Sequence, residues 1–461
     1  MMSKKFDKTS TSSILQYAKG LENNSLKDLC GEMIISSMKN KGNFGTLLEE
    51  FYFGYKPNSN SEPDFLQVEL ELKSTPLKKL KNGEWVCKER LVLNIINYLD
   101  VPNEDFFSSS FWKKNKNLLL VFYLYEVELL PLEYIIDLVD IWNFPTKDLG
   151  IIRGDWDIIK SKIIQGKAHQ ISEGDTIYLG ACTKGSTAEK SFREQPFSDE
   201  LAKQRAYSLK RSYLNTIYKT LKGNSEFQSV LTEEELKSGS FEDLIIKKFK
   251  PFLSLNDNEI QHELGIDLNR KSKNYFSSIS KRILGVSEDK FIEEFEKASI
   301  TIKSIRIKEN GKIKENISFP SFQFNNIIQE DWENSTIKEL VENKFLFVFY
   351  RENGKNFVFE KVGFWNLSSN DMDEFERVFE RTKHIIRTGE IVKEISNKGI
   401  IYNNFPKSSE SYLTHIRPHG RDKNDTYPLP IPDLKTNRTE FTKQSFWINS
   451  TYVEKVFSSL I

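Results

Sequence analysis

The 461-residue sequence predicts a mixed α/β protein made of two homologous halves, each with a central mixed sheet flanked by helices. Three observations support this fold class. Each half combines helical periodicity with short apolar runs that are typical of buried strands. The same landmarks recur in the same order in both halves, and a polar segment separates them.

The composition excludes several classes of protein. With 38% hydrophobic and 29% charged residues, the chain is neither disordered nor fibrous. The three cysteines are far apart, which excludes a disulfide framework and fits a reducing compartment. The longest apolar run (118–125) is too short to span a bilayer, and the first residues lack a secretory signal, so we expect a cytoplasmic protein without membrane contact. Basic and acidic residues number 66 each, so any nucleic-acid surface must be local.

The repeat begins with two predicted buried strands, LLLVFY at 118–123 and FLFVFY at 345–350. A Trp-Asn pair follows each strand and lies 24 residues before a glycine, Gly166 in one case and Gly389 in the other. The intervening residues have the pattern of a long amphipathic helix. Two further pairs recur later in both halves. They are a Tyr-Leu pair (178–179 and 412–413) and a Lys-Gln pair that begins at Lys203 and at Lys443.

These landmarks predict a first domain over 1–222 and a second over 241–461. The residues between them, 223–240, are polar and include glycine and serine, as expected of a linker.

Residues 63–73 carry the strongest indication of chemistry. The run from Val68 to Lys73 alternates apolar and charged residues, which predicts a strand with Glu69, Glu71 and Lys73 on one face. Asp64 can return to the same point from a neighbouring turn. Two such carboxylates can hold Mg²⁺, which lowers the pKa of a bound water, while Lys73 orients that water or stabilises the transition state. The alternative is a charged, solvated strand face.

The segment 203–222 contains six cations and no acid, among them Lys203, Arg205, Lys210 and Arg211. Its interleaved tyrosines, at 207, 213 and 218, could contact bases or sugars while the cations neutralise DNA phosphates. The alternative is a solvated helix face with the tyrosines packed inward.

The blocks at 45–54, 63–64 and 69–76 resemble the active-site block of the MutH mismatch-repair nicking enzyme. They resemble more closely the Sau-three-A type of GATC-cutting type II restriction endonucleases, and that similarity continues through 77–83, 88–98, 155–156, 182–185 and 442–449. The resemblance implies two MutH-like, restriction-endonuclease-like halves and Mg²⁺-dependent hydrolysis of double-stranded DNA containing GATC. We expect a monomer in solution that can dimerise on DNA.

The family's metal-binding and catalytic positions match Asp64, Glu71 and Lys73. A third acid precedes Gly54, and counting back favours Glu50 as catalytic and metal-binding residue. Glu49 stays open, because the distance from Gly45 to Gly54 is one residue longer than in relatives. A further family lysine matches Lys114, with Lys113 and Lys116 as competitors. The family's DNA-reading loop matches Thr183 and Lys184 here, and its nicking-enzyme form matches Arg417-Pro418-His419 in the second half.

The second half lacks this chemistry. When the two halves are aligned, Thr301 corresponds to Glu71 and Lys281 to the helix acid. Glu294 corresponds to Asp64, with an uncertainty of one residue. Because a cation opposes Mg²⁺ binding, this half should be non-catalytic. Its cationic run, from His415 to Lys423, fits a DNA-binding or regulatory domain; the alternative is a structural half kept for stability.

Two other functions compete with a restriction endonuclease. One is a MutH-like nicking endonuclease, which would cut a single strand. The other is a non-catalytic DNA-binding relic, which the intact Asp64, Glu71 and Lys73 oppose.

Overall fold

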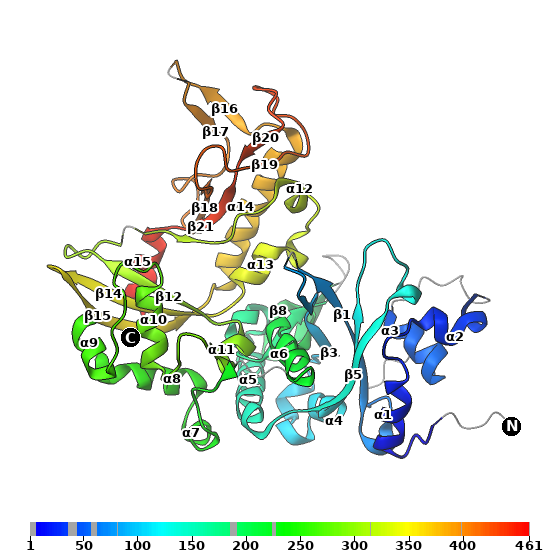
Figure 1. Cartoon of the computed structure of the whole chain (residues 1–461). Coiled ribbons are helices and arrows are strands. Elements are labelled where there is room, and N and C mark those ends of the chain that lie inside the picture. Colours follow the sequence, from blue (N-terminus) through cyan, green and yellow to red (C-terminus); the bar gives the residue numbers. More distant parts are fainter. Residues whose placement is uncertain are drawn as a thin grey trace. The chain divides into compact units, whose positions relative to one another are not determined.

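The computed structural model describes residues 6–35, 44–56, 62–80, 82–184, 191–223, 227–313, 315–397 and 399–460. By its internal contacts the chain divides into two compact units, whose elements are labelled in Figure 1. Unit 1 comprises Met1–Phe241 with Lys290–Ser299, and unit 2 comprises Glu242–Asp289 with Ile300–Ile461.

The central sheet of unit 1 has the strand order β2-β1-β4-β5. Strands β1 and β4 are parallel, and the other pairs are antiparallel. The predicted strand 118–123 is confirmed inside β4, where six consecutive residues are buried. The bounds are β1 Glu71–Lys79, β2 Trp85–Cys87, β4 Asn117–Leu124 and β5 Ile136–Asn143.

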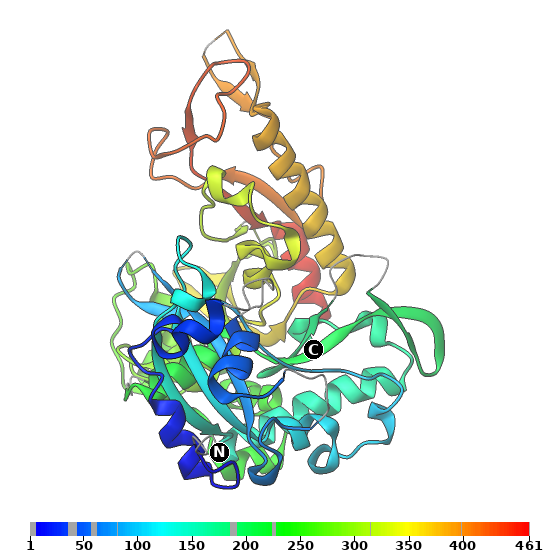
Figure 2. The ribbon, with the colours of Figure 1, turned by 90° about the vertical axis from the view of Figure 1, so that its right-hand side faces the viewer.

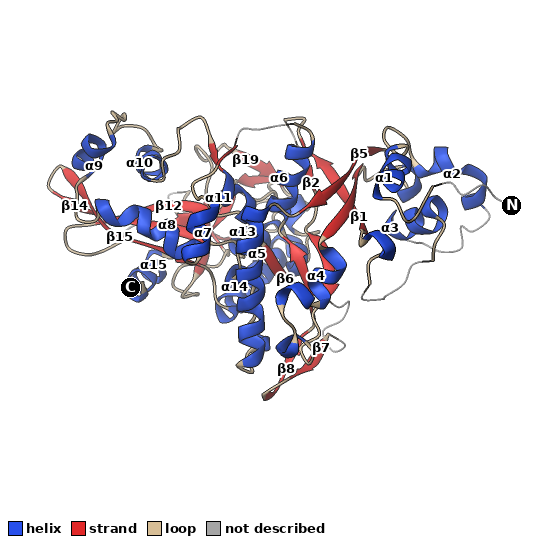
Figure 3. Cartoon of the chain, turned by 90° about the horizontal axis from the view of Figure 1, so that it is seen from below, coloured by secondary structure: helices blue, strands red, loops and turns tan. Residues whose placement is uncertain are grey.

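A second sheet of unit 1 has the order β3-β9-β6. The strands β7 and β8, labelled in Figure 3, form a hairpin that precedes β9 in the sequence. Two short strands, β10 and β11, pair in parallel. The bounds are β3 Leu91–Ile95, β6 Leu179–Thr183, β7 Phe192–Gln195, β8 Ser198–Lys203, β9 Arg205–Leu209, β10 Phe227–Gln228 and β11 Phe291–Ile292.

The helices of unit 1 pack on these sheets, and α1, α3 and a following π-helix contribute to an apolar core with β1 and β4. Their bounds are α1 Thr11–Lys19, α2 Leu26–Ile35, α3 Phe44–Leu47, the π-helix Leu48–Phe53, α4 Ser110–Asn115, α5 Thr146–Ile164, α6 Arg211–Leu221, α7 Glu233–Ser238 and α11 Glu293–Ala298.

Unit 2 repeats both sheets, with the orders β12-β14-β15 and β13-β21-β18, and adds the hairpins β16–β17 and β19–β20. Its strands are β12 Thr301–Ile307, β13 Ile317–Ser318, β14 Phe345–Asn353, β15 Asn356–Trp365, β16 Val392–Ile395, β17 Ile401–Asn403, β18 Thr414–Pro418, β19 Thr426–Pro428, β20 Glu440–Thr442 and β21 Gln444–Ile448.

The long helix α14 runs beside β18 and β21 in Figures 1 and 2 and buries its apolar stripe in the core of unit 2. The helices of this unit are α8 Phe241–Phe249, α9 Asp257–Leu264, α10 Tyr275–Ile283, α12 Phe324–Ile327, α13 Thr336–Val341, α14 Ser369–Thr388 and α15 Ser450–Ser459.

The internal repeat is therefore present in the fold. The parallel pairs β1/β4 and β12/β14 correspond, with Glu71 opposite Leu118 and Thr301 opposite Phe345. Both predicted long helices, α5 and α14, are followed by glycines with left-handed backbone, Gly166 (φ 68°) and Gly389 (φ 70°). A side chain at either glycine would be strained, which explains why glycine stands there in both halves.

The predicted domain boundary differs from the observed division. The expected linker 223–240 lies in unit 1 and includes α7, and Lys290–Ser299, expected in the second domain, also belongs to unit 1. The physical reason is a set of buried charges. Lys297 Nζ lies 2.9 Å from both carboxylate oxygens of Asp148, and buried Glu294 accepts hydrogen bonds from the backbone N–H of Val230 and the hydroxyl of Ser229.

Two general features complete the description. Cys30, Cys87 and Cys182 are buried. Over the described ranges, every helix is too short or too polar to cross a membrane.

Candidate active site

Asp64 and Glu71 meet at the turn that leads into β1. The backbone N–H of Asp64 donates to Glu71 Oε2 (3.1 Å), and the backbone N–H of Leu72 donates to Asp64 Oδ2 (3.0 Å). Phe65 and Leu70 pair across the turn and hold its two ends together. Asp64 therefore lies next to Glu71, as the sequence predicted.

The strand is shorter than predicted, and this removes Glu69 from the cluster. Residues Leu66–Val68 form a 3-10 turn, Glu69 has a left-handed backbone (φ 51°), and β1 begins only at Glu71. Glu69 is exposed and forms an ion pair with Lys116 (2.5 Å). The turn breaks the alternation, so only Glu71 and Lys73 share the expected face.

Two lysines contact the same oxygen of Glu71. Lys73 Nζ lies 2.7 Å and Lys114 Nζ 3.6 Å from Glu71 Oε1, and all three side chains are largely buried. Lys114 comes from α4, whose first turn is capped by the Ser109 hydroxyl. Lys113 is exposed instead. The geometry thus selects Lys114 among the three lysines considered.

The third acid near the cluster is Glu49, and not the favoured Glu50. The helix before Gly54 widens into a π-helix, in which the N–H of Gly54 donates to the carbonyl of Glu49, five residues earlier. One extra residue in the turn rotates the preceding side chains, so counting four residues back from Gly54 leads to an exposed side chain. Glu49 is half-buried and Glu50 is exposed.

The charged side chains of the cluster shift the pKa of Glu49. Burial raises the pKa of Glu49; Lys73 and Lys114 oppose this shift, and Glu71 adds to it. The extra residue between Gly45 and Gly54 was the signal in the sequence, because inserted residues are commonly accommodated as π-turns at functional sites.

The carboxyl of Asp64 has a raised pKa. Burial raises the pKa of Asp64 to about 7, the charges of Glu71 and Glu49 add to the shift, and the hydrogen bond from Leu72 and the charge of Lys73 oppose it. A group of acids held this close is costly without a cation, and a bound metal would relieve that cost.

The residues fit a divalent metal of the hard, oxygen-preferring kind. Within the described parts of the chain, no group of three or more His, Cys, Asp or Glu side chains forms a preassembled cage. Mg²⁺ does not need one, because it binds through one or two carboxylates and completes its shell with water and substrate phosphate. Asp64 and Glu71 supply the two carboxylates, and Glu49 lies beside them.

The predicted DNA-reading residues of unit 1 lie at one end of the second sheet. Thr183 ends β6 opposite Arg205 on β9, and Arg205 Nη1 donates to the carbonyl of Ala181 (2.6 Å). Lys184 follows directly, its N–H bonded to the carbonyl of Gln204, and Lys203 is exposed. Gly185, which closes the resemblance in this loop, lies outside the described residues.

The rest of the basic segment is structural. Lys210 is 8% exposed and donates to the carbonyl of Thr176 (2.9 Å), so it cannot reach DNA as predicted. Arg211 begins α6 and is only partly exposed. The three tyrosines are buried, which contradicts a base-contacting role. The structure agrees with the alternative of a helix whose tyrosines pack inward. Tyr213 and Tyr218 lie on the buried face of α6 together with its apolar residues.

In unit 2, Arg417 projects from β18 with its guanidinium over the ring of Trp447 (4.8 Å), and it is exposed. His419 is also exposed, with Nδ1 3.1 Å from the carbonyl of Phe319. Lys443 forms an ion pair with Asp425 (2.5 Å), which reduces its positive field. His415 is buried, and burial lowers its pKa, so the cationic run effectively begins at Arg417.

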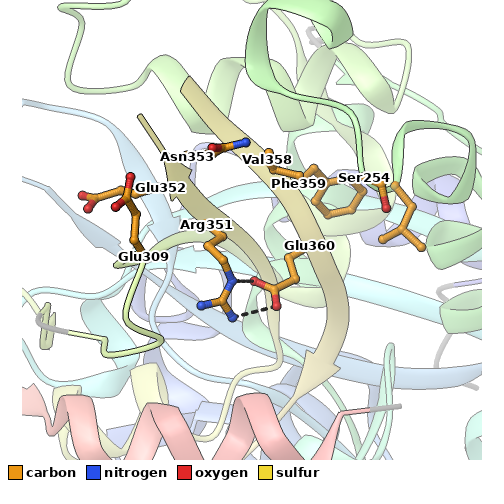
Figure 4. Close-up of a pocket in the computed structure, with 9 residues that line it drawn as sticks. Ser254, Glu309, Arg351, Glu352, Asn353, Val358, Phe359 and Glu360 are labelled. Atoms are coloured by element: carbon orange, nitrogen blue, oxygen red, sulfur yellow. Dashed lines mark hydrogen bonds and ion pairs between the residues drawn. The ribbon is translucent and has the colours of Figure 1, made fainter. Parts of the chain in front are cut away.

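A hollow of about 540 Å³ in unit 2 is not part of this site. It is lined by residues of β14 and β15 and of two loops, and Figure 4 shows Arg351 and Glu360 facing each other in a double hydrogen bond. None of the predicted site residues lines it. Because its arginine is already paired with a carboxylate, the hollow offers no free cation for a phosphate.

Comparison with known proteins places the chain in a family of DNA-cutting enzymes. The family model described as "DNA mismatch repair enzyme MutH" matches residues 53–155 and 287–377, which include β1 and β12 respectively. The type II restriction enzyme Sau3AI of Staphylococcus aureus is 34% identical over 482 aligned residues, covering 95% of this chain and 98% of that protein.

Proposed function

The chain belongs to the family of MutH and Sau3AI-type restriction enzymes, and on that premise we propose that it is a type II restriction endonuclease that hydrolyses both strands of DNA at GATC with Mg²⁺. The observation that carries this proposal is the closed arrangement of Asp64, Glu71 and Lys73 at the start of β1. The GATC sequence rests on the resemblance alone.

In this mechanism Asp64 and Glu71 would hold the metal, with Glu49 in support. The metal, when bound, lowers the pKa of a water and neutralises charge on the phosphate. Lys73 and Lys114 place two cations beside Glu71, where they stabilise the negative charge that develops on the phosphoryl oxygens. Water attacks phosphorus, and the bond from phosphorus to the leaving sugar oxygen breaks.

The proposal is tested by digesting one mapped plasmid, with and without adenine or cytosine methylation, in Mg²⁺, and sequencing the ends. We expect double-strand breaks at every unmethylated GATC and none in excess chelator. Random ends, or no cleavage under any condition, would refute it.

A MutH-like nicking enzyme is the second candidate, because the MutH family model matches both units. Such an enzyme would convert supercoiled plasmid to open circles and stop there. The extensive similarity to a type II restriction enzyme favours linear products instead. Following the open-circular and linear forms over time separates the two activities.

We propose that unit 2 binds DNA without cutting it. The reason is that Thr301 occupies the strand position in unit 2 that is equivalent to the position of Glu71 in unit 1. We also propose a cytoplasmic protein that is monomeric alone and dimerises on DNA. Light scattering with and without a GATC duplex in Ca²⁺ tests the oligomeric state.

A further inference from the structure

The active site contains a tyrosine that the sequence analysis did not single out. Tyr55 follows Gly54, whose left-handed backbone (φ 72°) ends the π-helix, and its N–H donates to the carbonyl of Glu49 (3.1 Å). The ring packs edge-on against Phe65, the neighbour of Asp64, with centroids 5.9 Å apart. Both ends of the cluster therefore fix the position of this ring.

The hydroxyl of Tyr55 is shielded from solvent and has no hydrogen-bond partner among the described residues. Buried tyrosine hydroxyls are normally bonded, so such an orphan at an active site calls for an explanation. Acceptors nearby are also unused. In the described chain, Asp64 Oδ1 and the carboxylate of Glu49 accept no hydrogen bond, whereas Asp64 Oδ2 and both Glu71 oxygens do.

The surroundings of the phenol determine which role it can take. A phenol has an ordinary pKa of about 10, so the Tyr55 oxygen keeps its proton at neutral pH. A phenol that stays protonated beside carboxylates serves as a hydrogen-bond donor and not as a base. Its natural partner is an anionic oxygen that reaches the cluster from outside the chain.

We propose that Tyr55 is a further residue of the reaction centre, whose hydroxyl donates a hydrogen bond to a non-bridging oxygen of the scissile phosphate. This inference rests on the proposed function, since it needs a DNA phosphate at the acids. Because the hydroxyl is shielded in the DNA-free chain, it would meet the phosphate only after bound DNA opens this side of the cluster, and it would then stabilise the charge that develops on the phosphoryl oxygens. The hydroxyl would thus act with Lys73 and Lys114 on the transition state.

The test compares wild type with Tyr55→Phe, which removes only the hydroxyl. Tyr350→Phe is the matched control, because Tyr350 in β14 also has a buried hydroxyl but belongs to unit 2. Single-turnover cleavage of a GATC duplex should fall roughly 10- to 100-fold in Tyr55→Phe and stay within twofold in the control. The Kd for the same duplex in Ca²⁺ and the Tm of the metal-free protein should change little in either variant.

Phosphorothioate duplexes identify the oxygen that is contacted. Sulfur in one of the two non-bridging positions should slow wild type, and that slowing should largely disappear in Tyr55→Phe. An equal effect of sulfur on both proteins, or a cleavage rate within twofold of wild type, would overturn the proposal. A lower affinity for Ca²⁺ in Tyr55→Phe would also overturn it, because the hydroxyl would then act on the acids. If wild type cuts no duplex, the proposed function fails first, and the two failures are distinguished.

Discussion

The starts of β1 and β12 occupy the same place in two homologous sheets but differ in charge. In unit 1, Lys73 is paired with Glu71 at 2.7 Å. In unit 2, Thr301 stands where Glu71 stands, and Lys303, the counterpart of Lys73, has no ion pair among the described residues. Burial alone lowers the pKa of Lys303. The comparison teaches that a lysine at the same strand position is compensated by a carboxylate in unit 1 and lacks one in unit 2, so its burial there costs more.

The acids that precede these strands differ even more. Asp64 closes back onto Glu71 within its own unit. Its aligned counterpart, Glu294, is fully buried in unit 1, where Val230, Ser229 and Lys147 satisfy its carboxylate. A position that we propose for metal binding in one half is occupied in the other by a carboxylate that is satisfied entirely by groups of the chain itself.

In the strands that we propose to read DNA, the arginine and the hydroxyl of one cross-strand pair have exchanged places between the two units. Arg205 on β9 faces Thr183 on β6 in unit 1, whereas Arg417 on β18 faces Ser445 on β21 in unit 2. Each sheet thus presents one arginine and one hydroxyl at the same register. Only Arg417 is exposed, because Arg205 is drawn back to the carbonyl of Ala181.

The largest expected effect concerns the acids of unit 1. Glu71→Ala and Asp64→Ala should each lower the cleavage rate at least roughly 1000-fold and leave DNA binding in Ca²⁺ within a few fold, because metal ligands serve the transition state. Glu69→Ala, two residues away but exposed, should cut at the wild-type rate. Gel-based cleavage assays check this, and full activity of either acid variant would remove the assignment.

The buried charges of Lys290–Ser299 should have the largest effect on stability. Lys297→Met leaves the carboxylate of Asp148 buried without its cation, which typically costs about 3–5 kcal/mol. The double variant Asp148→Asn/Lys297→Met removes both charges and should recover most of that loss. Urea unfolding of the full chain measures both variants. Equal destabilisation by the single and double variants would show that the segment is held by other contacts.

The third acid distinguishes two neighbouring residues. Glu49→Gln should lower the cleavage rate roughly 10- to 100-fold, since it removes a charge that supports the metal site. Glu50→Gln should stay within twofold, because that side chain is exposed. If Glu50→Gln proved to be the impaired variant, the π-helix would have to be absent in the working enzyme.

Arg417 tests DNA reading by unit 2. Arg417→Ala in the full chain should cost about 1–3 kcal/mol of DNA binding if the guanidinium contacts a guanine edge, and only on GATC duplexes. A phosphate contact would instead weaken binding to all sequences, with a loss that shrinks at high salt. Titration of GATC and scrambled duplexes at two salt concentrations separates these cases. No change on either duplex would leave unit 2 a structural role.

The smallest effect is expected at Lys303. The lowered pKa means that the folded protein binds this proton less tightly than the unfolded chain, whose ordinary value is 10.5. The charged lysine therefore destabilises the fold at low pH, and the cost fades as the pH rises through the folded pKa. Lys303→Met should raise the free energy of unfolding by about 1 kcal/mol at pH 7 and by less at pH 10. A difference that grows with pH would contradict this.

Local patterns in the sequence determined the repeat, the buried strands β4 and β14, the helices α5 and α14 and the meeting of Asp64 with Glu71. Apolar runs, helical spacing and closely spaced acids act over short stretches of chain, so they can be read without a structure. The family resemblance matched Lys114 best among three lysines, and Lys114 is the one of them that lies beside Glu71.

Only the tertiary structure decided three other points. The choice between Glu49 and Glu50 depends on the width of one helical turn, which adjacent packing sets. The burial of Lys210 depends on its hydrogen bond to the carbonyl of Thr176, 34 residues away in the sequence. The transfer of Lys290–Ser299 to unit 1 depends on Asp148, 149 residues before Lys297. Such contacts arise because a buried charge must find a partner wherever the fold brings one near, and no local pattern records that partner.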